Sequence, residues 1–124
     1  MDANVKQLWI SALRSGEYDQ GRGVLHYERD GVHSYCCLGV LCDVAVRQGI
    51  ISAPREVDKE YIYAGATTEL PIPVMEWAGL DNPSGSLGRW VSLTGNVRSA
   101  NLVNMNDALQ MPFWKIADVI EEYF

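Results

Sequence analysis

The segment from residue 24 to residue 48 constrains the fold of this chain more than any other. Residues 24–28 and 32–36 are rich in β-branched and aromatic side chains, and Asp30-Gly31 between them is a tight-turn signal, which predicts a β-hairpin. Immediately afterwards, apolar residues recur at helical spacing from Leu38 to Ala45, and Gly49 follows, which predicts a helix over 37–48. A hairpin joined directly to a helix is typical of an α+β protein.

The remaining patterns predict further helices at both ends and less regular structure in the middle. Asp2 and Gly16 bracket an apolar stripe, so a helix is expected over 3–15. The residues expected to point inward are Val5, Leu8, Ala12 and Leu13, and Trp9 and Ile10 flank this stripe. A last helix opens at Pro112 with Phe113, Ile116, Ala117 and Ile120 inward. Between them we expect a strand over 59–63, a short helix over 70–80, a loop over 81–88, a strand over 89–93 and a short apolar segment over 102–105.

These elements predict one α+β domain over residues 1–124, with three to four helices packed on a small antiparallel sheet that contains the hairpin. The chain is 48% hydrophobic and 21% charged, which is a globular composition rather than a disordered one. The N-terminus enters an amphipathic pattern at once, so we expect no secretion signal. No apolar run is long enough to cross a membrane.

The net charge and the cysteines limit which partners, cofactors and cellular compartment are expected. A net charge of −6 repels DNA, RNA and anionic lipid, so we expect neither polymer nucleic acid nor membrane as a partner, whereas a few arginines could still hold a small anion. The three cysteines are too badly spaced for a disulfide framework, which favours a cytoplasmic protein. Adjacent Cys36 and Cys37 cannot both easily ligate one tetrahedral ion, so we expect no metal and no cofactor.

Two loop regions contain residues suited to a ligand. The first, residues 14–23, combines three glycines with Arg14, Tyr18, Gln20 and Arg22. Arginines can form forked hydrogen bonds to phosphate, glycines let backbone N–H groups approach an anion, and a tyrosine can stack on a base. The alternative is a glycine-rich loop with solvated arginines.

The second region pairs Arg89 and Trp90 with Arg98, on either side of an expected turn over residues 94–96. An exposed tryptophan beside arginine suits stacking on a nucleobase, whereas a tryptophan can equally be a core anchor. Asn104, Asn106 and Asp107 could read polar ligand edges, although capping of the final segments explains them as well.

The sequence contains only weak signals of an enzyme active site. Cys36 or Cys37 near a helix N-terminus, with His26 or His33 on the hairpin as a base, could form a cysteine hydrolase, but no oxyanion hole or third orienting group can be identified. The carboxylates, including those of the last helix, are better explained as solvated surface charge. We therefore expect a protein that is not an enzyme.

Several segments resemble a family of small proteins encoded by tailed bacteriophages and prophages. They are Leu8-Trp9, residues 12–20, Tyr35 to Asp43, Leu70-Pro71, Trp77 to Leu80, Asn106-Asp107 and Ile116 to Glu121. Where that family has Ser-Phe before the last helix, this chain has Pro112-Phe113-Trp114. The family brings no established chemistry, but the resemblance implies a protein of the infected cell, where phages use small factors to counter immunity.

The leading hypothesis is a phage anti-defence protein that sequesters a cyclic nucleotide-type immune signal, such as a cyclic oligonucleotide or a cyclic ADP-ribose derivative, without cleaving it. Its expected site residues are Arg14, Tyr18, Gln20, Arg22, Arg89, Trp90 and Arg98. We expect a homo-oligomer, because a site between subunits can enclose a ligand. The alternatives are an acidic interaction module that inhibits a host protein and, third, the cysteine-dependent hydrolase.

Overall fold

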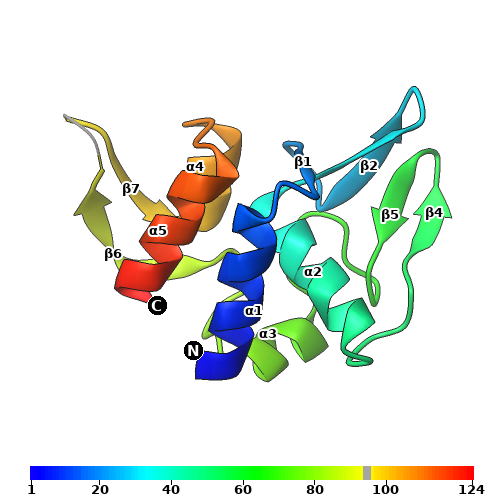
Figure 1. Ribbon diagram of the computed structural model, residues 1–124, viewed down its shortest axis with the longest axis horizontal. Helices are drawn as coiled ribbons and strands as arrows, with labels where there is room; N and C mark the ends of the chain where they lie inside the picture. Colours follow the sequence, from blue (N-terminus) through cyan, green and yellow to red (C-terminus); the bar gives the residue numbers. More distant parts are fainter. Residues whose placement is uncertain (94–95) are drawn as a thin grey trace.

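The structure, a computed structural model, describes residues 1–93 and 96–124, and the expected turn over residues 94–96 therefore lies largely outside the described residues. The helices are α1 (Ala3–Arg14), α2 (Cys37–Arg47), α3 (Ile72–Ala78), α4 (Leu102–Asp107) and α5 (Phe113–Tyr123). The strands are β1 (Asp19–Gln20), β2 (His26–Arg29), β3 (Val32–Tyr35), β4 (Arg55–Val57), β5 (Glu60–Ile62), β6 (Ser86–Ser92) and β7 (Arg98–Asn101). This is the α+β architecture that the sequence predicts (Figure 1).

The main sheet has five strands in the order β1-β3-β2-β5-β4. Strands β2 and β3 form the predicted hairpin, and Asp30 (φ 53°) and Gly31 (φ 79°) form its turn in the left-handed region. The expectation of a purely antiparallel sheet is wrong at one edge, because β1 pairs with β3 in parallel through Asp19–Ser34 and Gln20–Tyr35. The segment after α1 therefore runs in the same direction as β3, the hairpin strand beside which it lies.

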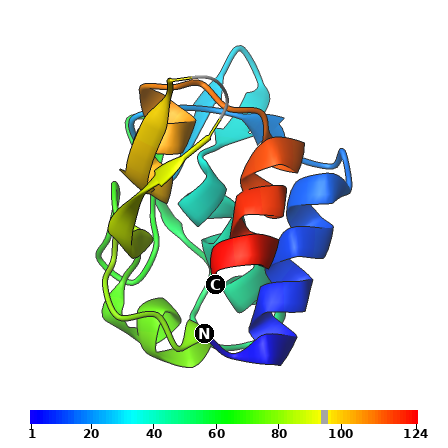
Figure 2. The same cartoon turned by 90° about the vertical axis from the view of Figure 1, so that its left-hand side faces the viewer.

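Helix α1 begins and ends where the sequence predicts. The Asp2 carboxylate accepts a hydrogen bond of 2.9 Å from the Val5 amide, and Gly16 (φ 77°) follows the last turn. The expected inward stripe is partly wrong, since Leu8 is exposed whereas Trp9 and Ile10, expected only to flank it, are buried. Helix α1 lies beside α5 on one side of the molecule (Figures 1 and 2), so its buried face is rotated toward both α2 and α5.

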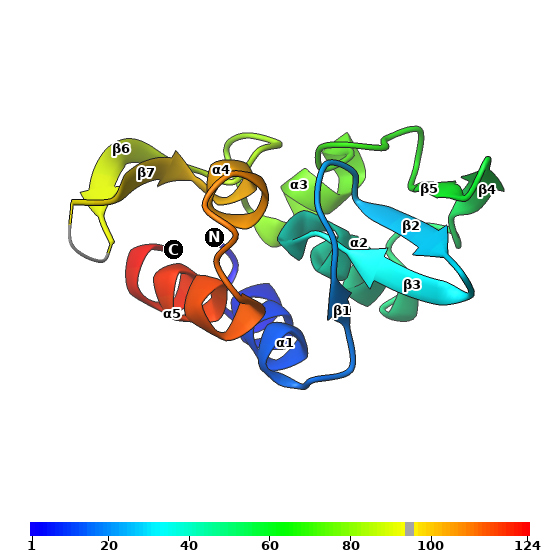
Figure 3. The same cartoon turned by 90° about the horizontal axis from the view of Figure 1, so that it is seen from above.

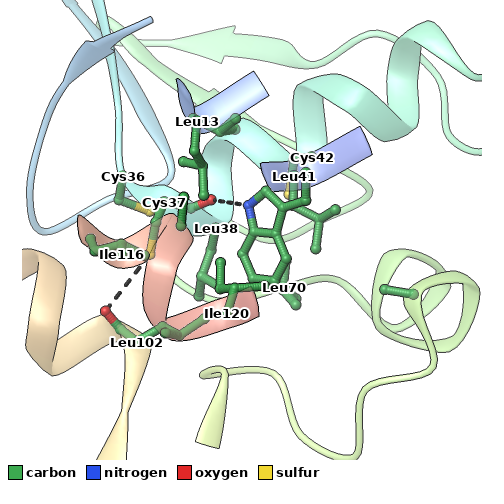
Figure 4. Packing of buried hydrophobic residues seen from close by; sticks show 14 of the residues in the cluster. Leu13, Cys36, Cys37, Leu38, Leu41, Cys42, Leu70, Leu102, Ile116 and Ile120 are labelled. Atoms are coloured by element: carbon green, nitrogen blue, oxygen red, sulfur yellow. Dashed lines mark hydrogen bonds between the residues drawn. The ribbon is translucent and has the colours of Figure 1, made fainter. Parts of the chain in front are cut away.

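Helix α2 is the centre of the core. Its residues from Cys37 to Cys42 are buried, and Cys37 Sγ donates to the Leu102 carbonyl with Ile116 and Ile120 packed nearby (Figure 4). The indole of Trp9 donates a 2.9 Å hydrogen bond to the Cys37 carbonyl. Helix α2 approaches the chain at Leu25 so closely that a Cβ on Gly39 would lie 1.7 Å from the Leu25 carbonyl oxygen. This contact fixes the helix against the start of the hairpin.

Asn106 is fully buried and joins three parts of the chain. Its amide nitrogen donates to the Gly21 carbonyl and to Asp107, while its oxygen accepts from Gln20 Nε2 at 2.8 Å and from the Cys37 amide at 3.2 Å. A buried amide with these partners stabilises the arrangement of the loop, α2 and α4. Asn106 is therefore a structural residue.

Four short elements were not expected from the sequence. The expected strand over 59–63 is β5, but its partner β4 was missed, as were β1, β7 and the helical character of 102–107. Strand β6 begins at Ser86, inside the expected loop. The described residues thus contain five helices rather than three to four. Elements of two to seven residues depend on their tertiary partners more than on local pattern.

None of the helices in the described part of the chain combines the length and the apolar character that crossing a membrane requires.

Candidate functional site

Three of the expected site residues are held by other parts of the chain. The Arg14 guanidinium forms ion pairs with Asp118 (2.7 Å) and Glu121 (2.8 Å) of α5. The Tyr18 hydroxyl donates to Asp43 of α2, and Gln20 Nε2 donates to Asn106 and to the Met111 carbonyl. In this structure these side chains fasten the loop after α1 to the body of the protein.

Arg22, by contrast, is exposed and lines an open groove of about 970 Å³. The groove is formed by the loop between β1 and β2, strand β2 and the turns of the two hairpins β2–β3 and β4–β5. Its lining residues are Arg22, Val24, Tyr27, Glu28, Arg29, Asp30, Gly31, Asp58, Lys59 and Glu60. Figure 3 shows the two hairpins side by side at one end of the molecule.

The register of the strands places Tyr27 and Arg29 on the outer face of the sheet. Tyr27 pairs with Ser34 on one side and with Glu60 on the other, so these residues share its face. The Arg29 guanidinium lies 5.2 Å from the centroid of the Tyr27 ring. The groove therefore contains a tyrosine ring with a guanidinium over it, a flat cationic surface on which a planar ligand can stack.

Gly21 makes room for this arrangement. It is buried, and a Cβ at this position would lie 2.7 Å from Tyr27 Cε1 and 3.0 Å from Ser34 Cβ. The absence of a side chain lets the Tyr27 ring lie against the backbone that leads from β1 to Arg22. Gly21 thus sets the position of the ring relative to the arginine.

The groove carries charges of both signs. Arg22, Arg29 and Lys59 supply cations, and four carboxylates also line it: Glu28, Asp30, Asp58 and Glu60. Glu28 is partly engaged, because Tyr61 donates to it at 3.1 Å and Lys59 lies 4.0 Å away. Asp58 and Lys59 occupy the left-handed region (φ 52° and 69°), so the turn between β4 and β5 presents both side chains beside the groove.

The opposite face of the same strands holds an aromatic cluster with buried His26 and Tyr63 at its centre and exposed His33 at its edge. The His26 ring is stacked between Tyr35, at 4.0 Å, and Tyr61, at 3.9 Å between ring centroids. Its Nδ1 is hydrogen-bonded to the hydroxyl of Tyr63 (2.7 Å), and its Nε2 to Nδ1 of His33 (2.8 Å). In neutral His26 one ring nitrogen donates and the other accepts, and both nitrogens have a partner here.

Protonation of His26 is disfavoured there. Only 4% of the side chain is exposed, and burial, followed by the proximity of His33, lowers the pKa of His26 to about 4. Burial also raises the pKa of Tyr35 to about 12 and that of Tyr63 above its usual range. His26 is thus a neutral, hydrogen-bonded part of the packing, and the Glu28 carboxylate lies at the edge of the cluster, where it accepts from Tyr61.

The cysteines lie in the core. Cys36, Cys37 and Cys42 are all buried, and burial raises the pKa of Cys36 to about 11 and the pKa of the other two thiols above the usual range. Cys36 caps α2 by accepting from the Gly39 amide. A thiolate nucleophile is unfavourable in such surroundings. Within the described residues, no group of three potential ligands is placed to hold a metal ion.

Arg89, Trp90 and Arg98 lie on the hairpin of β6 and β7, at the opposite end of the molecule from the groove (Figures 1 and 3). The Arg89 guanidinium lies 5.6 Å from the centroid of the Tyr123 ring of α5. Trp90 is 63% exposed, so it is not a core anchor in this chain. The two groups of expected site residues therefore do not form one site within a single chain.

The sequence analysis named Arg22 but not Tyr27, Arg29 or Lys59, which line the same groove. The alternation within the predicted hairpin contains the signal for two of them, since Tyr27 and Arg29 are neighbours on one face of a strand. Lys59 could not be placed, because the pairing of β5 with β2 through Tyr27–Glu60 is a long-range contact.

Comparisons with known proteins identify a family but no activity. Neither a curated protein nor a solved structure matches the chain. A family described as a domain of unknown function, DUF8296, matches residues 1–124. Because this match covers all of the sequence, the chain belongs to the DUF8296 family.

Proposed function

We propose that this protein binds a small nucleotide-type anion in the groove beside β2 and sequesters it without cleaving it. The observation that carries the proposal is the convergence of Arg22, Arg29 and Lys59 on one open groove that also contains the Tyr27 ring. Arg22 forms no ion pair among the described residues, so its guanidinium is available to a ligand.

Each part of a nucleotide has a matching group in the groove. Arg22 and Lys59 can bind phosphate, Arg22 through a forked pair of hydrogen bonds. The guanidinium of Arg29, supported by Tyr27, offers a surface on which a base can stack. Carboxylates such as Asp30 and Glu60 can accept hydrogen bonds from ribose hydroxyls. A ligand with both hydroxyls and phosphate suits this mixture of charges better than phosphate alone.

Binding without cleavage is part of the proposal. His26 and the thiols lie in the interior, and the acidic residues of the groove are assigned to hydrogen bonds with ribose hydroxyls. Together with the resemblance to phage proteins, these features support a factor that withholds a cyclic nucleotide-type immune signal from its receptor. The net charge of −6 opposes binding of polymer nucleic acid and leaves this local site as the means of anion recognition.

Native mass spectrometry with a panel of cyclic di- and trinucleotides and cyclic ADP-ribose isomers tests the proposal. We expect at least one compound to be retained and released with unchanged mass. Arg22→Ala and Arg29→Ala should each weaken its binding roughly tenfold or more, as expected for loss of a charged hydrogen bond or stacking group. The matched control is Arg55→Ala, which removes the same charge from β4, outside the residues that line the groove.

Two outcomes would contradict the proposal. If the protein retains none of the compounds, a host protein that binds the acidic surface becomes the better candidate partner. Binding of that partner would depend strongly on salt concentration. A compound recovered in hydrolysed form would indicate an enzyme.

A further inference from the structure

The hairpin of β6 and β7, which we call the arm, presents one face to the body of the protein and one to solvent. Alternation along β6 places Arg89 and Val91 on the inner face, where Arg89 lies over Tyr123 and Val91 is buried. Trp90 and Ser92 are on the other face, and Arg98 joins them because it pairs with Ser92. Trp90 and Arg98 therefore share an exposed face.

The arm also differs from the rest of the chain in charge. Between Asp81 and Asp107 the only charged residues are Arg89 and Arg98, whereas the chain as a whole carries −6. The arm is therefore a basic, aromatic projection on an acidic protein. An exposed aromatic residue beside an arginine is typical of the centre of an interface.

The groove at the opposite end offers the complementary chemistry. It is lined by four carboxylates and three cations, and its volume of about 970 Å³ can admit an indole ring. Asp30, Asp58 and Glu60 form no ion pairs among the described residues, so they can receive an arginine. The arm and the two hairpins whose residues line the groove lie at opposite ends of the long axis (Figures 1 and 3), so an arm can reach only the groove of another molecule.

We infer that the arm of one copy docks in the groove of a second copy, with Trp90 against the Tyr27–Arg29 surface and Arg98 beside Asp30 and Asp58. Such a contact joins two different surfaces and is head-to-tail, so it propagates to a closed ring or a chain of subunits rather than stopping at a symmetric dimer. Trp90 then takes the Tyr27–Arg29 surface on which a nucleotide base would stack, so a docked arm and a bound nucleotide exclude one another in the same groove. This inference does not rest on ligand binding.

Mixing two variants provides the test, with assembly measured by native mass spectrometry and sedimentation at roughly 100 µM protein without added ligand. The arm variant is Trp90→Ala/Arg98→Glu, and the groove variant is Tyr27→Ala/Glu60→Lys. We expect the wild type to assemble and each variant alone to be monomeric. An equimolar mixture should form a dimer and nothing larger, because only one arm and one groove remain intact.

The control is Trp114→Ala, which removes a tryptophan of similar exposure (60%) from α5 and should leave assembly unchanged. Assembly should also weaken as the salt concentration is raised from about 50 to about 500 mM, because salt screens the attraction between exposed charges. A monomeric wild type, an arm variant that still assembles, or a mixture that stays monomeric would each overturn the inference. Because no ligand is present, failure of nucleotide binding would not affect these results.

Discussion

The two faces of strand β2 use the same kinds of side chain for opposite purposes. On the inner face, His26 is stacked between two tyrosines and bonded at both ring nitrogens. On the outer face, Tyr27 and Arg29 form a similar contact between a ring and a planar cation, but beside an open groove. The inner contacts stabilise the fold, and the outer ones are available to a partner. Residue type alone does not distinguish the two roles.

The contact between α2 and the hairpin should be the most sensitive to substitution. Gly39→Ala would place a Cβ 1.7 Å from the Leu25 carbonyl oxygen, so we expect a loss of at least about 3 kcal/mol in the free energy of unfolding, or failure to fold. Urea denaturation measures this loss. Helix propensity alone would make the same substitution stabilising by about 1 kcal/mol, and such a gain would show that the packing described is wrong.

The two faces of β2 can be compared directly by truncation. His26→Ala removes a buried ring and leaves Tyr63 and His33 without a partner, so a loss of about 2–4 kcal/mol is expected. Tyr27→Ala removes a half-buried ring from the outer face and should cost roughly 1 kcal/mol. Equal losses in denaturant titrations would remove the distinction between the faces.

The pH dependence of the free energy of unfolding tests the contribution of His26, on the inner face of β2. The pKa of His26 is about 4 in the folded protein and about 6.5 in an unfolded chain, so the unfolded state binds the extra proton first. Stability should therefore decrease as pH falls from about 6.5 toward 4, by up to about 3 kcal/mol, and the contribution of His26 should level off below about 4.

The measurement is the free energy of unfolding between pH 7 and pH 5, above the range in which most carboxylates titrate. His26→Gln should flatten the dependence. An unchanged slope in this variant would mean that another group causes it.

Whether a feature could be predicted from the sequence depends on how far apart along the chain its interacting residues lie. The hairpin, α1, α2 and α5 were predictable because their turns, caps and apolar spacing are local, as Asp30-Gly31 and Asp2 illustrate. The parallel pairing of β1 and the placement of Lys59 depend on distant partners and were not. The partners that hold Arg14 and Gln20 could not be predicted for the same reason, since they lie in α5 and α4, between 86 and 107 residues away along the chain.

An amide chemical-shift titration of isotopically labelled protein tests the central claim most directly, because it reports whether the panel compounds bind and where. With the cyclic nucleotides and cyclic ADP-ribose isomers added in turn, we expect the largest shifts at Arg22, Tyr27, Arg29 and Lys59. The amides of His26 and Tyr63, on the inner side of the sheet, should shift less. Shifts confined to the arm around Trp90 and Arg98, or no shifts with any compound, would contradict a ligand site in the groove.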